Sequence, residues 1–191
     1  MILYDISQEV FHCEVYPSDP APKREKVMEI SGGDSCNLTK FEMCAHNGTH
    51  MDAPYHFIEE GKTVEQLDLG KCIGEALVVE AGGELDQRSA AKIMKSGMKR
   101  ILIKGKAVVT AEAAEEFNRW QAVLIGVESQ SVGPVNSPEQ VHRILLSQEV
   151  ILLEGLVLSE VPEGRYFLSA VPLNLGGADG APVRAVLVKW E

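Results

Sequence analysis

The sequence lacks the features that mark a nucleic-acid-binding or membrane-spanning protein. Its 18 lysine and arginine residues are outnumbered by 28 aspartate and glutamate residues, so the formal net charge is -10. The basic residues form no cluster that would bind phosphate groups. No stretch approaches the roughly 18 consecutive apolar residues that a transmembrane helix needs. We therefore expect neither a nucleic-acid partner nor a membrane partner.

Cysteine is scarce, and its spacing shows no C-x-x-C motif. The N-terminal residues M-I-L-Y-D-I-S have neither the basic region nor the long apolar region of a secretory signal. We therefore expect a reduced, cytoplasmic protein. Cys44 precedes His46 by two residues, so a thiol enzyme is an alternative, although free cysteines are more often small buried hydrophobic residues.

Two common catalytic motifs are also missing. The sequence contains no G-x-S-x-G, and no serine has the context of a nucleophile, which argues against a serine hydrolase. The glycine pairs that begin at Gly32 and Gly176 do not match the G-x-G-x-x-G fingerprint of dinucleotide enzymes.

The composition is that of an ordinary globular protein. The chain has 191 residues, of which 45% are hydrophobic and 24% charged, so we expect one domain spanning residues 1–191 with its own core. Short strand-like runs dominate the first third of the chain and predict a β layer there. They cover residues 2–6, 11–16, 26–30 and 38–46.

The rest of the chain alternates between strands and helices. We predict strands at 76–80, 100–104, 123–127, 150–153, 166–173 and 182–190, and helices at 89–95, 111–120 and 137–147. Thr110 is a candidate N-cap, and Ser137-Pro138-Glu139-Gln140 combines an N-cap, a proline at the first helical position and a capping-box glutamine. The fold class is therefore α/β, with mixed β-sheet layers and a few flanking helices.

One short segment holds most of the histidine. Residues 45–58 read A-H-N-G-T-H-M-D-A-P-Y-H-F-I and contain three of the five histidines and an aspartate. Gly48 and Pro54 interrupt a regular strand and indicate a strand end that runs into a shaped loop. Imidazoles and a carboxylate that converge from such a loop are ligand types for Zn²⁺, Mn²⁺ or Fe²⁺. The candidates are His46, His50, Asp52 and His56.

A lone histidine would more often be a surface residue or a hydrogen-bonded core residue. Three histidines and an aspartate together favour a metal site, but the spacing does not say which of them bind and which remains for chemistry.

A second locus lies further along the chain. His142 falls on the predicted helix 137–147, and Glu154 follows the apolar run at 150–153. A carboxylate at that position projects from the end of a buried strand, where α/β sheets commonly present functional groups. Taken alone, both residues could equally be ordinary polar surface positions.

The pattern H-x-G-T-H-x-D-x-P-x-H-F resembles the signature of the cyclase-like metal-dependent hydrolases, a family that includes kynurenine formamidases and isatin hydrolases. Similar segments recur in the same order: Y-P-S-D-P near the N-terminus, G-V-E-S-Q-S-V-G-P, H-R-I-L-L and L-E-G-L further on, and L-N-L-G-G-A-D-G-A-P-V-R-A-V-L in the tail. The resemblance covers nearly the whole chain and implies a swivelling β/β/α fold.

The resemblance also implies a ligand set. By its pattern His46, His50 and Asp52 hold one metal, and in two-metal members Asp52 is shared with a second ion held by His142 and Glu154. Some members contain one metal, often manganese, and others two zinc ions, so we expect one or two Zn²⁺ or Mn²⁺ per chain.

By the same pattern His56 is the acid/base and not a ligand. Glu128 departs from the family, because relatives usually have aspartate after that strand, and its meaning is open.

The implied reaction is hydrolysis of a small amide or cyclic amide. A bound divalent ion supplies an activated water and polarises the carbonyl, and a histidine delivers a proton to the departing amine. The resemblance favours N-formylkynurenine, cleaved to kynurenine and formate, and implies a homo-oligomer, a dimer or a tetramer. The alternatives are a hydrolase of a lactone or cyclic imide, or a non-catalytic metal-binding protein.

Overall fold

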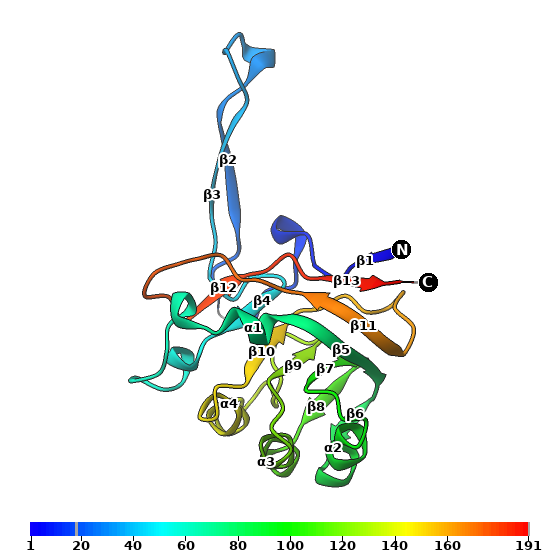
Figure 1. The fold of residues 1–191 in the computed structure, drawn as a ribbon. Helices are drawn as coiled ribbons and strands as arrows, with labels where there is room; N and C mark the ends of the chain where they lie inside the picture. Colours follow the sequence, from blue (N-terminus) through cyan, green and yellow to red (C-terminus); the bar gives the residue numbers. More distant parts are fainter. Residues whose placement is uncertain (18, 191) are drawn as a thin grey trace.

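The structure, a computed structural model, describes residues 1–17 and 19–190 and centres on one large mixed sheet (Figure 1). The nine strands follow the order β1-β13-β11-β5-β7-β9-β10-β4-β12. Strands β5, β7, β9 and β10 are parallel to one another, and the remaining neighbours are antiparallel. Their bounds are β1 (Ile2–Asp5), β4 (His50–Asp52), β5 (Ile73–Glu80), β7 (Arg100–Lys104), β9 (Leu124–Val127), β10 (Ile151–Glu154), β11 (Gly164–Ser169), β12 (Gly180–Pro182) and β13 (Val186–Lys189).

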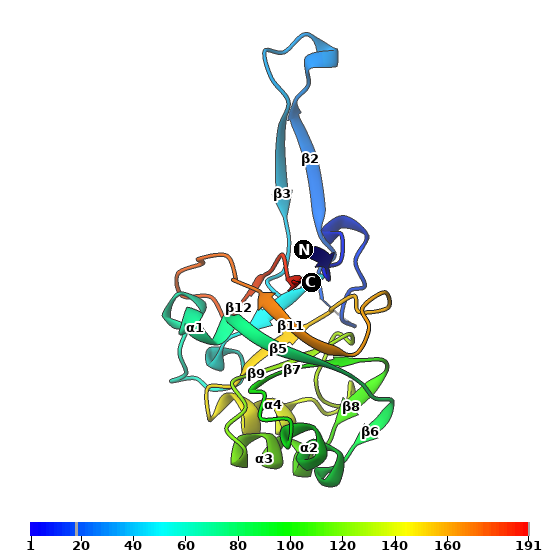
Figure 2. The same cartoon turned by 45° about the vertical axis from the view of Figure 1, so that its right-hand side comes forward.

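The parallel centre of the sheet is buried on both faces. Every residue of β9 and β10 is buried, which explains why these strands read as unbroken apolar runs. Helices α2 (Gln87–Met94), α3 (Ala111–Arg119) and α4 (Glu139–Leu146) lie side by side below the sheet (Figures 1 and 2). The predicted α/β class is thus confirmed.

Two hydrophobic clusters flank the central strands. One joins the helices to the sheet and includes Phe117 and Leu145. The other lies on the opposite face, where the sheet curls, and includes Met51 and Leu187. The short helix α1 (Leu69–Cys72) leads into β5, and a small parallel pair, β6 (Gly83–Leu85) and β8 (Ala107–Val109), lies beside α2 and α3. None of the described helices is long and apolar enough to cross a membrane.

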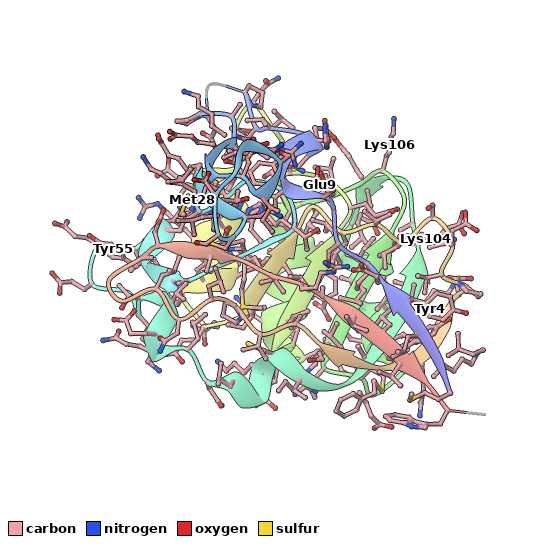
Figure 3. All side chains as sticks on the ribbon, turned by 90° about the horizontal axis from the view of Figure 1, so that it is seen from above. Tyr4, Glu9, Met28, Tyr55, Lys104 and Lys106 are labelled. Atoms are coloured by element: carbon pink, nitrogen blue, oxygen red, sulfur yellow. The ribbon has the colours of Figure 1, made fainter. Side chains whose placement is uncertain are left out.

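A long hairpin projects from this body. Among the residues that the structure describes, strands β2 (Lys23–Met28) and β3 (Leu38–Glu42) pair only with each other, and they extend far beyond the main sheet (Figures 1 and 2). Viewed from above, Met28 of the hairpin lies on the same side of the body as Tyr55, and Tyr4 of β1 lies on the opposite side (Figure 3). The hairpin therefore stands on the β4–β12 end of the sheet.

The first third of the chain differs from the prediction. It forms no layer of its own, because β1 and β4 join the main sheet and β2 and β3 form the hairpin. The strand predicted at 11–16 is wrong: Val10–His12 is a single 3₁₀ turn, begun when the Glu9 side chain accepts the Phe11 N–H. Phe11, one of the apolar residues that suggested a strand, packs edge-on against Phe41 of β3.

The predicted helices exist with slightly shifted ends. Thr110 caps α3 as expected, since its side chain accepts the N–H of Ala113. The Ser137 cap of α4 is wrong, because Pro138 occupies the N-cap position with no side-chain cap. The Pro138 carbonyl accepts the first helical hydrogen bond, from the N–H of His142 at 3.2 Å, so Ser137 lies one residue before the cap.

Candidate metal centre

Two neighbouring strands bring three candidate ligands together in the interior. The antiparallel register of β4 and β10 places His50 opposite Glu154 and Asp52 opposite Leu152. Because side chains alternate along a strand, His50 and Asp52 share one face. Nε2 of His50 lies 3.5 Å from Oδ1 of Asp52 and 3.4 Å from Oε2 of Glu154, and all three side chains are buried. The interior thus holds two carboxylates beside one imidazole.

The other two candidate ligands reach the same place from a loop and from helix α4. His46 lies in the turn before β4, and its Nδ1 is 3.0 Å from Oδ1 of Asp52. His142 projects from α4, with Nε2 3.5 Å from Oδ2 of Asp52 and 3.2 Å from Oε1 of Glu154. Asp52 therefore stands between two groups of side chains: one oxygen faces His46 and His50, and the other faces His142.

Backbone carbonyls orient two of the imidazoles. Nδ1 of His50 donates to the Gly48 carbonyl at 3.0 Å, and Nδ1 of His142 donates to the Pro138 carbonyl at 2.8 Å. A carbonyl only accepts, so Nδ1 carries the proton and the lone pair of each neutral ring sits on Nε2, directed at the carboxylates. Gly48 has φ 68°, a left-handed conformation that glycine adopts without strain.

The carboxylates of the cluster attract positive charge. Burial lowers the pKa of His46, but hydrogen bonds to Asp179 and Asp52 outweigh it and raise that pKa to about 11. Burial likewise lowers the pKa of His142, and the hydrogen bond to Glu154 raises it to about 8. Burial raises the pKa of Asp52, yet His46 holds it below its usual range. The cluster therefore favours cations, either protons on its imidazoles or a metal ion.

A bound divalent metal fits these residues. Oδ2 of Asp52 is buried and has no hydrogen-bond partner among the described residues, which costs free energy unless a cation compensates it. Imidazole nitrogens and carboxylate oxygens are the donor set of Zn²⁺, Mn²⁺ and Fe²⁺. Two groups have ligand atoms close enough to share an ion: His50, Asp52 and Glu154, and also His46, Asp52 and His56.

His56 lies at the edge of the cluster. It ends the 3₁₀ turn Pro54–His56, and its ring stacks on that of His46 with the centroids 4.0 Å apart. Its side chain is 28% exposed, whereas those of His50 and His142 are at most 3% exposed. This position gives His56 access to the solvent and to a ligand in the cavity.

Asp179 is a site residue that the sequence analysis did not single out. Its Oδ2 accepts hydrogen bonds from Nε2 of His46 at 2.9 Å and from Nδ1 of His56 at 3.1 Å. These two bonds hold the pKa of the Asp179 carboxyl below its usual range. Asp179 immediately precedes β12, whose Gly180 pairs with Asp52. Asp179 lies in the G-G-A-D-G-A-P segment, which the sequence analysis considered as part of the tail that resembles the family.

Glu128, whose meaning was open, has a structural role. Its carboxylate accepts the N–H of Gly105 at 2.6 Å and the N–H of Leu158 at 2.7 Å, so it joins two loops outside the cluster.

Cys44 lies at the wall of the site cavity with a partly buried side chain.

A cavity of about 360 Å³ opens onto the cluster. Its wall combines aromatic, hydroxyl, amide and acidic side chains and includes no lysine or arginine from the described residues. Beyond the cluster itself, it is lined by Tyr16, Asp19, Cys44, Phe57, Gln130, Ser131 and Pro138. The space suits a small organic molecule in contact with the imidazoles and carboxylates.

Comparison with known proteins identifies the family. The family model described as "Putative cyclase" matches residues 4–152 of this chain. The chain belongs to this cyclase family. Kynurenine formamidases are similar over almost the entire length: that of Geobacillus thermodenitrificans is 36% identical over 97% of this chain and 96% of its own, and that of Erythrobacter litoralis is 33% identical over 97% and 93%. The family expected from the signature is thus confirmed.

Two solved structures agree with the observed fold. A potential metal-dependent hydrolase with cyclase activity superposes with a TM-score of 0.85 at 28% identity, covering 100% of this chain and 98% of its own. Isatin hydrolase A from Labrenzia aggregata superposes with a TM-score of 0.83, covering 97% of this chain and 93% of its own. At 18% identity this second likeness bears on the fold alone.

Proposed function

We propose that this cyclase-family chain, one domain over residues 1–191, is a metal-dependent amidohydrolase that cleaves N-formylkynurenine to kynurenine and formate, a step of tryptophan catabolism. The observation that carries the proposal is the buried cluster of imidazoles and carboxylates, open to a cavity of about 360 Å³. The kynurenine formamidases that match it over 93–97% of both chains support the choice of substrate.

The proposed ligands are the five residues of the cluster. His46, His50 and Asp52 would hold one divalent ion, and Asp52, His142 and Glu154 a second one, each oxygen of Asp52 facing one set. Zn²⁺ and Mn²⁺ both suit this donor set. When bound, such an ion lowers the pKa of a coordinated water towards about 7 and polarises a carbonyl oxygen.

We assign the proton transfer to His56. Asp179 occupies its Nδ1, so Nε2 is the nitrogen that remains for the substrate. Amide hydrolysis requires a proton on the departing nitrogen, and a histidine with partial access to solvent can deliver it and be reprotonated. A general acid/base of this kind contributes roughly 10²- to 10⁴-fold to the rate.

We propose that the protein works as a homo-oligomer, at least a dimer, and that the projecting hairpin binds a second copy. The exposed apolar side chains of the hairpin are Val27, Ile30, Leu38 and Phe41. Residues 23–42 contain four basic and four acidic side chains, so the whole net charge of -10 belongs to the rest of the chain. A hairpin without net charge is not repelled by the acidic body of a partner, and its basic side chains can face that body. These side chains are Lys23, Arg24, Lys26 and Lys40.

We also propose a cytoplasmic location, with which the free cysteines are consistent.

A substrate panel tests the proposal. Metal-stripped protein is reloaded with Zn²⁺ or Mn²⁺ and offered N-formylkynurenine, other N-formyl anilides, a lactone and a cyclic imide. The proposal expects turnover of N-formylkynurenine only with metal. Turnover restricted to the lactone or imide would keep the family and change the substrate, and stoichiometric metal binding without turnover of any compound would indicate a metal-binding protein.

A further inference from the structure

We propose that Asp179 is a positioning residue that couples the orientation of the ligand His46 to that of the acid/base His56. One carboxylate oxygen, Oδ2, accepts a hydrogen bond from each imidazole, at 2.9 and 3.1 Å. The inference rests on the proposed function for the roles of the two histidines, but the contacts themselves do not depend on it.

The chain holds Asp179 firmly relative to the cluster. The Asp179 carbonyl accepts the N–H of Ala53 at 2.9 Å, and the preceding Ala178 carbonyl accepts the N–H of Val64 at 3.0 Å. On the other side β12 pairs with β4, with Gly180 opposite Asp52. These backbone hydrogen bonds fix the position of Asp179 relative to β4, the strand that carries Asp52.

The bonds determine which nitrogen of each ring faces the cluster. Asp179 accepts a hydrogen bond from Nε2 of His46, so Nδ1 of the same ring is directed at Oδ1 of Asp52, 3.0 Å away. The Asp179 carboxylate also accepts a hydrogen bond from Nδ1 of His56. In the neutral ring the proton is therefore on Nδ1, and Nε2 is left for the substrate. Because the two rings stack at 30° with centroids 4.0 Å apart, a change in one displaces the other.

Glycine at the next position lets the strand approach closely. A Cβ on Gly180 would lie 2.7 Å from Cε1 of His46 and 2.9 Å from the Met51 carbonyl. The backbone of β12 therefore supports one flank of the His46 ring, and the Asp179 carboxylate holds its outer nitrogen. Together these contacts restrict the orientation of the ring.

The test compares Asp179→Ala and Asp179→Asn with Glu65→Ala as the matched control. Glu65 accepts the N–H of Gly177 at 3.0 Å and so steadies the same turn, but it lies outside the imidazole contacts described here. Three quantities are measured: Zn²⁺ affinity by chelator competition, the tautomer of the neutral His56 ring by ¹⁵N NMR without metal, and kcat and KM with N-formylkynurenine.

The proposal expects Asp179→Ala to weaken Zn²⁺ binding and lower kcat by about 10- to 100-fold each, with little change in KM, and to shift His56 towards the Nε2–H tautomer. Asp179→Asn, which keeps an acceptor oxygen, should recover part of each loss, and Glu65→Ala should resemble wild type. Wild-type affinity and tautomer in Asp179→Ala, or equal losses in Glu65→Ala, would overturn it. If the wild-type protein does not hydrolyse N-formylkynurenine, only the proposed function fails. The Zn²⁺ affinity and the His56 tautomer still test the role of Asp179 in that case.

Discussion

His50 and Glu154 face each other across the antiparallel pair β4–β10, and their Nε2 and Oε2 atoms lie 3.4 Å apart in the buried interior. Asp52 adds a second carboxylate on the same face. Buried carboxylates are costly unless cations compensate them. The sheet therefore contains a charge arrangement that a divalent ion would stabilise.

The first prediction is that His50→Ala loses stoichiometric metal, because the proposed site loses the ligand nitrogen that lies 3.5 Å from Asp52 and 3.4 Å from Glu154. Wild-type protein should contain one or two ions per chain and unfold at a lower temperature after chelation. The control is His12→Ala, because His12 is 77% exposed and lies outside the cluster. Unchanged metal content in the His50 variant by elemental analysis would refute the ligand assignment.

Replacing His56 should separate catalysis from metal binding. We expect His56→Ala and His56→Asn to keep near-wild-type metal while kcat falls by roughly two to four orders of magnitude. Metal content and kcat are measured on the same preparation. Loss of metal would make His56 a ligand, as its proximity to His46 and Asp52 allows, and an unchanged kcat would assign proton transfer elsewhere.

Gly180→Ala should weaken metal binding, because Gly180 of β12 lies against the ring of the proposed ligand His46. The added methyl group would lie 2.7 Å from Cε1 of His46, so the ring or β12 must shift, and we expect roughly 10- to 100-fold weaker metal binding. Gly176→Ala in the loop before β12 is the matched control, because nothing lies within 4 Å of its added atom. Equal affinities of the two variants, measured by chelator titration, would show that His46 tolerates the displacement.

Cys72 should make the fold sensitive to alkaline pH. Burial raises the pKa of its thiol to about 11 from an ordinary value of 9.0. The thiol therefore ionises first in the unfolded chain, and the free energy of unfolding should fall as the pH rises from about 9 to about 11. Denaturant titrations across this range should show a smaller fall for Cys72→Ala than for wild type or for Cys36→Ala, whose thiol is exposed. Equal falls in all three proteins would contradict the prediction.

The hairpin should control assembly. We expect light scattering at micromolar concentration to report at least twice 20.8 kDa. The double substitution Ile30→Ser and Phe41→Ser, at side chains 59% and 55% exposed, should reduce the mass. The exposed Leu3→Ser on β1 is the control. A wild-type mass near 20.8 kDa would reject the oligomer, and an unchanged mass in the double variant would place the interface elsewhere.

Local sequence signals predicted the centre of this molecule well. The apolar run at 100–104 is strand β7 with the same bounds, and Glu154 ends a buried strand as expected. Spacing alone drew attention to residues 46–56, because a strand and its adjoining loop are local structures.

Features that depend on distant pairing could not be predicted in this way. The role of Asp179 follows from the pairing of β12 with β4, which no local pattern encodes. The run at 11–16 has the alternation of a strand but no strand partner, so it forms a turn and a loop. For His142 the resemblance was needed, because its position on a helix does not indicate which strand the helix covers.

The most direct test of the central claim is hydrolysis of N-formylkynurenine as a function of bound metal. Metal-stripped wild-type protein and His50→Ala are titrated with Zn²⁺ or Mn²⁺, and kynurenine release and bound metal are recorded on the same samples. We predict that wild-type activity rises in proportion to bound metal, up to one or two ions per chain, and that His50→Ala gains neither metal nor activity. Equal activity of the wild-type protein with and without metal would contradict it.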